Sequence, residues 1–258
     1  MTPQFVDTHC HFDFPPFNGD ETQSLQLARE AGVEKLIAVG VTADRFAGVM
    51  ALADQYAPVY AALGIHPMAI NEFRDEHLEQ LEAWLQQRPD KLVAIGEIGL
   101  DLFIDNPQFK RQEALLDAQL RLARKHDLPV ILHSRRTHDK LAMHLRRLDL
   151  PRRGVVHGFA GSEQQALALI RAGYFIGVGG TMTYERATKT RRTLSRLPLS
   201  SLLLETDSPD MPIQGFQGKS NRPERLHNIW QSLCELREEP PQEIAEVIRD
   251  NSRRLFHI

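Results

Sequence analysis

Short apolar runs alternate with longer amphipathic stretches along almost the whole chain. The runs are rich in Val, Ile and Leu, and their length suits buried β-strands. The stretches between them repeat apolar residues at helical spacing, which is the pattern that βα units of a parallel sheet produce. The eight expected strands are Phe5–His9, Lys35–Val39, Val59–Ile65, Leu92–Ile98, Pro129–His133, Gly154–His157, Tyr174–Val178 and Leu202–Glu205.

The stretches between the expected strands carry helix signals of their own. Residues 111–125 place Leu and Ala at helical spacing. Ser162 and Gln165 are spaced as a capping box, which predicts that a helix begins there. After the last strand, residues 225–256 are expected to form two helices separated at Pro240-Pro241, because proline cannot continue a helix.

The length of the chain fits one closed barrel. A (β/α)8 barrel needs about 250 residues, and the chain has 258 with no internal repeat, low-complexity tract or linker. We therefore predict an α/β fold, a (β/α)8 TIM barrel, in which residues 1–258 form a single domain.

Composition narrows the class of protein. Hydrophobic residues at 42% and charged residues at 25% are ordinary for a soluble globular protein. No apolar run approaches the ~18 residues of a membrane span, and we see no leader of basic then apolar residues. The two cysteines, Cys10 and Cys234, argue against a disulfide framework and suit a reducing compartment. We expect a cytoplasmic enzyme with no membrane association and no obligate protein partner.

Net charge limits the way in which a polyanion can bind. At −3 the chain does not have a generally basic surface. Any nucleic acid must therefore bind through a local basic patch.

A His-x-His motif closes the first expected strand, in Asp7-Thr8-His9-Cys10-His11. Residues two apart on an extended strand project from the same face, so His9 and His11 can reach one metal ion. Cys10 then points the other way, toward the barrel wall, as an inert core residue. By itself, the motif fits two structural histidines equally well.

Further residues of ligand type end other expected strands or directly follow them. In a parallel barrel all strands end at the same rim, so residues far apart in the sequence converge there. A catalytic zinc ion typically uses three protein ligands and keeps one open position, so this set is large enough for two ions. The expected metal ligands are His9, His11, Glu97, His133, His157 and Asp207.

The ligand types suggest different roles. Glu97 is placed to offer one oxygen to each ion, and two ions about 3.5–4 Å apart suit phosphoester hydrolysis. Asp207 is expected to bind one ion and to accept a proton from the attacking water. Glu205 is interpreted as a carboxylate that orients a ligating histidine. His66 is suited to metal binding when neutral, but we favour a catalytic role in which the cationic ring binds the substrate phosphate or protonates a leaving oxygen.

Basic residues after the expected strands predict a phosphate-binding patch. Arg135 follows the fifth strand and Arg222 follows the eighth, and both are expected to contact substrate. Barrels often hold phosphate near the loops after strands seven and eight. The other cations expected on this rim are Arg136, Lys189, Arg191, Arg192, Lys219 and Arg225, whereas Arg146, Arg147, Arg152 and Arg153 are expected on the opposite rim.

Taken together, these motifs resemble those of the TatD-type metal-dependent deoxyribonucleases, a branch of the amidohydrolase-like barrels. The resemblance runs nearly end to end. It implies that the six expected ligands hold two divalent ions, and that the activity is hydrolysis of phosphodiesters, notably DNA. A local patch makes few phosphate contacts, which favours action near a strand end, so we expect 3′-5′ exonuclease-like action, although the sequence leaves the choice between exonuclease and endonuclease open. It rests on Asp7-Thr8-His9-Cys10-His11, Gly64-Ile65-His66-Pro67, Gly96-Glu97-Ile98-Gly99-Leu100-Asp101, Pro129-Val130-Ile131-Leu132-His133-Ser134-Arg135, His157-Gly158-Phe159-Ala160-Gly161 and Leu204-Glu205-Thr206-Asp207-Ser208-Pro209.

The chain departs from the family pattern in two places. Leu102-Phe103 stands where the family usually has an aromatic directly after Gly-Leu-Asp. Ser220-Asn221-Arg222-Pro223-Glu224 stands where the family usually has Arg-Asn-Glu-Pro. Replacing an acid by Arg222 leaves the metal prediction intact but weakens the DNA prediction.

Two other functions stay open from the sequence. One is hydrolysis of a C–N or C–O bond in a small metabolite, although two-ion enzymes of that kind commonly bridge their ions with a modified lysine after the fourth strand, where this chain has Glu97. The other is a non-catalytic metal-binding scaffold. The ligand types suit zinc, manganese, magnesium, iron or nickel.

Overall fold

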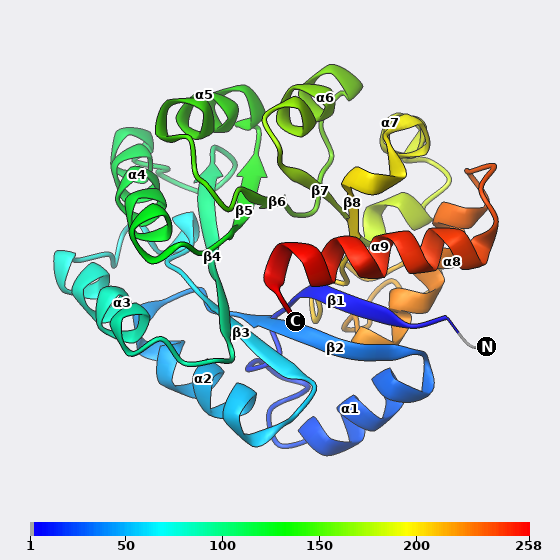
Figure 1. The fold of residues 1–258 in the computed structure, drawn as a ribbon, viewed down its shortest axis with the longest axis horizontal. Helices are drawn as coiled ribbons and strands as arrows, with labels where there is room; N and C mark the ends of the chain where they lie inside the picture. The colour runs from blue at the N-terminus through cyan, green and yellow to red at the C-terminus, as the bar shows by residue number, and fades with distance from the viewer. Residues whose placement is uncertain (1–2) are drawn as a thin grey trace.

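Eight parallel strands, hydrogen-bonded in the order of the sequence, surround the centre of the molecule (Figure 1). The structure is a computed structural model that describes residues 3–258. It confirms the predicted (β/α)8 TIM barrel, and every predicted strand is present with ends that shift by at most three residues. The strands are β1 (Phe5–Cys10), β2 (Val33–Val39), β3 (Val59–Leu63), β4 (Leu92–Asp101), β5 (Val130–Arg135), β6 (Gly154–Val156), β7 (Phe175–Val178) and β8 (Leu202–Leu204).

Helices surround the strands, as the alternating pattern predicted (Figure 1). The capping box forms, because Ser162 Oγ accepts from Gln165 N at 3.2 Å and Gln165 Oε1 accepts from Ser162 N at 2.9 Å. The predicted break at Pro240-Pro241 separates the last two helices. The helices are α1 (Glu21–Glu30), α2 (Phe46–Gln55), α3 (Asp75–Gln87), α4 (Phe109–His126), α5 (His138–Leu148), α6 (Glu163–Arg171), α7 (Thr188–Arg196), α8 (Leu226–Cys234) and α9 (Pro241–Phe256), with short 3₁₀ turns η1 (Ala43–Arg45), η2 (Pro67–Ala69), η3 (Gly180–Thr183), η4 (Leu199–Ser201) and η5 (Pro223–Arg225).

The barrel closes between β1 and β8 through a few backbone contacts. Cys10 and Ser208 form an isolated parallel bridge. His11 N donates to Ser208 O at 2.7 Å, and Asp207 N donates to His9 O at 2.9 Å. The backbone that closes the barrel is therefore the backbone that carries three of the predicted ligands.

Apolar side chains fill the barrel interior toward the amino ends of the strands. Ile131, Val155 and Leu203 belong to a buried cluster that also contains Leu255 and Phe256 from the end of α9. The carboxyl terminus accordingly lies near the centre of the barrel in Figure 1. A larger apolar cluster packs between the strands and the surrounding helices. None of the helices between residues 3 and 258 combines the length and the hydrophobicity that a membrane span needs.

Candidate metal centre

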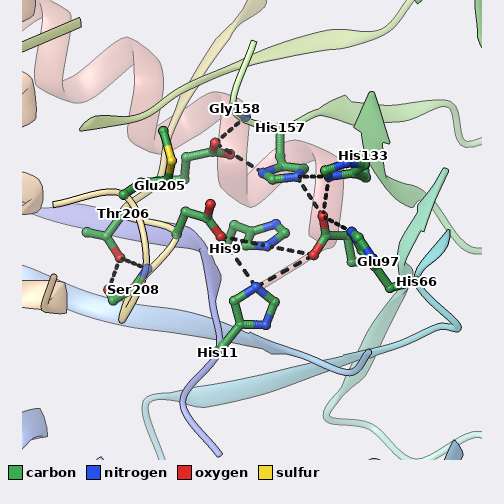
Figure 2. A network of polar contacts seen from close by, with 12 residues as sticks. His9, His11, His66, Glu97, His133, His157, Gly158, Glu205, Thr206 and Ser208 are labelled. Carbon is green, nitrogen blue, oxygen red and sulfur yellow. Dashed lines mark hydrogen bonds and ion pairs between the residues drawn. The ribbon is translucent and has the colours of Figure 1, made fainter. Parts of the chain in front are cut away.

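The six predicted ligands come together at the carboxyl end of the barrel, and Figure 2 shows five of them pointing toward one another. They come from β1, β4 and β5 and from the residues directly after β1, β6 and β8. Strand alternation brings the side chains inward, and the parallel barrel brings the strand ends together.

Glu97 lies in the middle of the group. Its Oε1 is 2.7 Å from His157 Nε2 and 3.0 Å from His133 Nδ1. Its Oε2 is 3.2 Å from His9 Nε2 and 3.6 Å from His11 Nε2. Each carboxylate oxygen thus faces a different pair of the predicted histidine ligands, which is the arrangement that a bridging carboxylate requires.

Asp207 lies on the His9 and His11 side of the group. Its Oδ1 is 3.4 Å from His9 Nε2 and 3.3 Å from His11 Nε2. The backbone of Asp207 has a φ of +56°, in the left-handed region that Asp adopts more readily than most residues. Asp207 lies beyond the end of β8 at Leu204, and its carboxylate faces the two histidines from this turn.

His66 lies among the ligand atoms as a neutral ring. Its Nδ1 accepts a hydrogen bond from Met68 N at 3.0 Å, so the ring proton is on Nε2, which is 3.2 Å from Glu97 Oε1. Burial lowers the pKa of His66 and favours the same neutral form. The three sets of ligand atoms that lie within 4.8 Å of one another are His9, His11 and Asp207; His66, Glu97 and His133; and His9, His157 and Glu205.

Buried nitrogen atoms of this group fit a metal ion. Both ring nitrogens of His9 and Nδ1 of His11 are buried without a hydrogen-bond partner among residues 3–258. Leaving a buried polar atom without a partner costs about 1–3 kcal/mol. Imidazole nitrogens together with carboxylate oxygens are the donors that zinc and other divalent transition metals bind. A divalent cation would therefore satisfy His9 Nε2, which is the one of these three atoms that faces Glu97 and Asp207.

The charges of the group also attract a cation. Burial raises the pKa of the Glu97 carboxyl, but the imidazoles of His157 and His66 lower it more, to well below its ordinary range. Burial lowers the pKa of His11, but the hydrogen bond and the charge of Asp207 raise it to about 9. These carboxylates stay ionised, and their negative charge stabilises the protonated form of a neighbouring imidazole. The same negative charge would attract a divalent ion.

Two further carboxylates contact the ligating rings from the outer side. Glu205 Oε1 is 3.5 Å from His157 Nδ1, which suits the predicted orienting role. Asp101 Oδ2 is 2.9 Å from His133 Nε2, a contact that the sequence analysis missed. The signal was present, because Asp101 is four residues after Glu97 on β4 and an even separation places both on one face.

Asp7 joins β1 to β8 next to the ligands and was also missed. It accepts hydrogen bonds from Thr206 N at 2.9 Å, from Thr206 Oγ1 at 2.6 Å and from His9 N at 3.3 Å. Burial raises the pKa of Asp7 to about 7, although these hydrogen bonds act to lower it. Cys10 is fully buried, as expected for a side chain that faces the barrel wall.

The two arginines that were expected to contact substrate differ in their ion pairing. Arg222 donates to Glu224 Oε1 at 2.8 Å and to Ser24 Oγ at 2.9 Å, so a neighbouring carboxylate compensates its charge. The guanidinium of Arg135 lies 3.7 Å from the centre of the Phe103 ring and has no carboxylate within 4.0 Å among residues 3–258. Of the two, Arg135 is the one without an ion pair to a carboxylate among residues 3–258.

A parallel (β/α)8 barrel with a buried histidine and carboxylate cluster at its carboxyl end is typical of metal-dependent hydrolases of the TIM-barrel class. The sequence matches the family described as TatD related DNase over residues 6–257. The chain therefore belongs to the TatD family, and the resemblance found in the sequence is confirmed.

Individual relatives agree with this membership. The chain is 61% identical to a protein of Escherichia coli (strain K12) named uncharacterized metal-dependent hydrolase YjjV, with 100% of both chains covered. The crystal structure of YjjV, described as a TatD homologue, matches with a TM-score of 0.98 over 100% of both chains. A Rahnella protein named 3′-5′ ssDNA/RNA exonuclease TatD is 33% identical, with 93% of both chains covered.

Proposed function

We propose that this protein hydrolyses phosphodiester bonds in DNA, acting from the 3′ end with the help of two divalent ions. The observation that carries the proposal is the position of Glu97, whose two oxygens face two different pairs of imidazoles. The activity named for the Rahnella relative supports the choice of substrate.

The proposed ligands divide around Glu97. His9, His11 and Asp207 would hold one ion, and His133 and His157 would hold the other. Ions held in this way supply Lewis acidity, because they lower the pKa of water and stabilise negative charge on a phosphate. Glu205 and Asp101 would orient His157 and His133 through their second ring nitrogens.

Asp207 is the proposed proton acceptor. Burial raises the pKa of its carboxyl, but the hydrogen bond from His11 and the neighbouring imidazoles lower it more, so the carboxylate is ionised and has an oxygen that can accept a proton. The oxygen of water forms a bond to phosphorus while the bond from phosphorus to the leaving sugar oxygen breaks. One proton of the water passes to Asp207, and the departing oxygen takes a proton from solvent.

His66 and Arg135 are the proposed contacts to substrate. Because the ring of His66 is neutral with its proton on Nε2, it donates a hydrogen bond rather than a proton to a phosphate or leaving oxygen. The guanidinium of Arg135, which lies over the Phe103 ring, would pair with a neighbouring phosphate. Arg222 is less suited to this role because Glu224 already compensates its charge.

The proposal is tested with single-stranded DNA in a linear form, labelled at its 5′ end, and in a circular form of the same sequence. Elemental analysis first establishes the ions in each protein sample, with zinc, manganese, magnesium, iron and nickel supplied in turn. We expect stepwise shortening of the linear strand from the 3′ end, with the circle spared. Equal cutting of both forms would overturn the exonuclease assignment. Inactivity toward both despite full metal loading would shift the function to C–N or C–O bond hydrolysis of a small metabolite.

A further inference from the structure

Large apolar side chains that stay exposed gather at the carboxyl-end rim of the barrel. Four of the five exposed large hydrophobic residues among residues 3–258 lie on loops after β3, β4 and β8: Met68, Leu102, Phe103 and Met211. The fifth, Met143, lies on α5. Phe103 is the aromatic member of the rim group, and its side chain is 49% exposed. A ring that stays half in water gains only part of the stability that burial gives, and part of its surface stays accessible to a ligand.

Two guanidinium groups lie over the Phe103 ring. Arg135 is 3.7 Å and Arg136 is 4.7 Å from the ring centre. Neighbours on an extended strand normally point to opposite faces, but Arg136 has a φ of +61°, and this left-handed turn lets both side chains reach one ring. Neither guanidinium has a carboxylate within 4.0 Å in the part of the chain that the structure describes. The three side chains form what we call the Phe103 platform: Phe103, Arg135 and Arg136.

The Phe103 platform is fixed relative to the metal centre. One carboxylate oxygen of Asp101 accepts a hydrogen bond from Phe103 N at 2.7 Å, and the other is 2.9 Å from His133 Nε2. Leu102 N donates to Arg135 O at 3.1 Å and continues the pairing of β4 with β5 into the platform. A single carboxylate therefore connects the backbone of Phe103 to a proposed metal ligand.

The opposite side of the barrel mouth also has an arginine over a phenylalanine ring, but there a carboxylate pairs with the arginine. Arg45 lies 3.8 Å from the centre of the Phe14 ring, and Phe14 lies 5.9 Å from His11, ring centre to ring centre. Here, however, Asp13 Oδ2 accepts from Arg45 Nε at 2.6 Å and compensates its charge. An anionic chain that crosses the metal centre therefore finds free positive charge on the Phe103 side.

Aromatic rings and guanidinium planes bind nucleobases by stacking, and guanidinium groups pair with phosphates. We propose that the part of the Phe103 ring that the two guanidinium groups leave exposed stacks an unpaired nucleobase of the nucleotide next to the scissile phosphate, while Arg135 and Arg136 bind the phosphate of that nucleotide. The assignment rests on the proposed phosphodiesterase function and deepens it. It makes Phe103 a specificity-determining residue, because a base that remains paired and stacked within a duplex cannot lie on the ring.

The decisive comparison uses two substrates of equal length: a single-stranded oligonucleotide, and a base-free oligonucleotide with the same sugar-phosphate backbone. With Phe103→Leu we expect kcat/KM for the normal strand to fall about 10-fold, or ~1.4 kcal/mol. The value for the base-free strand is expected to stay unchanged, and Phe103→Trp is expected to restore hydrolysis of the normal strand. Arg135→Ala is expected to weaken both substrates, since both contain phosphates. Met143→Ala, which truncates an exposed side chain on α5, serves as the matched control and is expected to change neither.

A second measurement does not depend on hydrolysis. The indole of Phe103→Trp reports stacking by fluorescence, after subtraction of the signal from wild-type protein, which contains Trp84 and Trp230. We expect the normal oligonucleotide to quench this signal and the base-free oligonucleotide to leave it unchanged.

The two measurements separate failure of the platform from failure of the proposed function. If Phe103→Leu changes kcat/KM equally for both substrates, or for neither, the stacking role of the Phe103 platform is wrong, whereas the proposed phosphodiesterase function is unaffected. Absence of base-dependent quenching would overturn it as well. If wild-type protein hydrolyses neither strand but the quenching occurs, the platform holds as a nucleobase-binding site and the phosphodiesterase function fails.

Discussion

The interior of the barrel contains two layers that come from the same strands but differ in chemistry. The layer toward the amino ends is apolar, and the layer toward the carboxyl ends consists of imidazoles and carboxylates. On three strands the change takes place over two residues, so both side chains lie on one face. The pairs are Ile131 and His133 on β5, Val155 and His157 on and directly after β6, and Leu203 and Glu205 on and directly after β8.

The difference between the layers shows how one barrel separates stability from chemistry. Each buried Leu, Ile or Val of the lower layer contributes about 1.5–3 kcal/mol to folding. Burial of polar groups in the upper layer acts in the opposite direction unless each group finds a partner. The lower layer and the end of α9 form an apolar floor, and charge interactions above such a floor are stronger than in water. Changes in the two layers should therefore have different consequences.

The largest effect is expected from Glu97→Ala in the upper layer. The substitution removes the carboxylate that faces both imidazole pairs, so bound ions and activity should be lost together. The expected loss of activity exceeds about 100-fold, because residues that only orient a ligand already cost 10–100-fold. Elemental analysis and the linear-strand assay measure both quantities. Glu113→Ala is the matched control, since Glu113 contacts His144 at 3.1 Å on the outer helices. Two ions per chain in the Glu97 variant would exclude the bridging role.

Asp207→Asn sharpens the comparison by keeping the shape of the upper layer. The amide oxygen can still coordinate an ion, but it cannot accept the proton of the attacking water. We expect turnover to fall by roughly 10²–10⁴-fold while the thermal unfolding temperature stays near that of wild-type protein. Single-turnover assays and calorimetry on the metal-loaded variant provide the measurement. Turnover close to the wild-type value would show that another group takes the proton.

Ile131→Ala tests the lower layer directly beneath His133. Removing the buried side chain should lower the free energy of unfolding by about 2–5 kcal/mol, and Ile131→Val by about 0.5–1.5 kcal/mol. Urea denaturation measures this change, and elemental analysis is expected to find the wild-type metal content in both variants. Loss of ions in proportion to loss of stability would break the division between the layers.

The smallest effect is expected from Glu205→Gln at the boundary of the layers. Glu205 contacts His157 Nδ1 at 3.5 Å and accepts a hydrogen bond from Gly158 N. The amide has nearly the same shape but less negative charge toward the ring, so metal affinity should fall about 10–100-fold. Competition with a chromogenic chelator measures the affinity. Unchanged affinity would reduce Glu205 to a packing role next to Gly158.

The sequence by itself determined the architecture and the place where the six predicted ligands come together. Strand and helix positions follow from local periodicity, and the capping box at Ser162 and the break at Pro240-Pro241 depend on neighbouring residues alone. Parallel strands that end at one rim brought His9 and Asp207 together in the prediction, although they lie far apart in the chain. Alternation along an extended strand was sufficient to place His11 beside them.

Only the tertiary structure decided which atoms meet. Asp7 finds Thr206 across 199 residues and Arg222 finds Ser24 across 198 residues, and neither partnership leaves a local pattern. The neutral form of His66 depends on a hydrogen bond from the turn that follows β3 and on burial inside the closed barrel. Local periodicity fixes which face of an element a side chain occupies. Pairing of side chains from different elements depends on barrel closure and loop conformation, which the sequence specifies only through the whole fold.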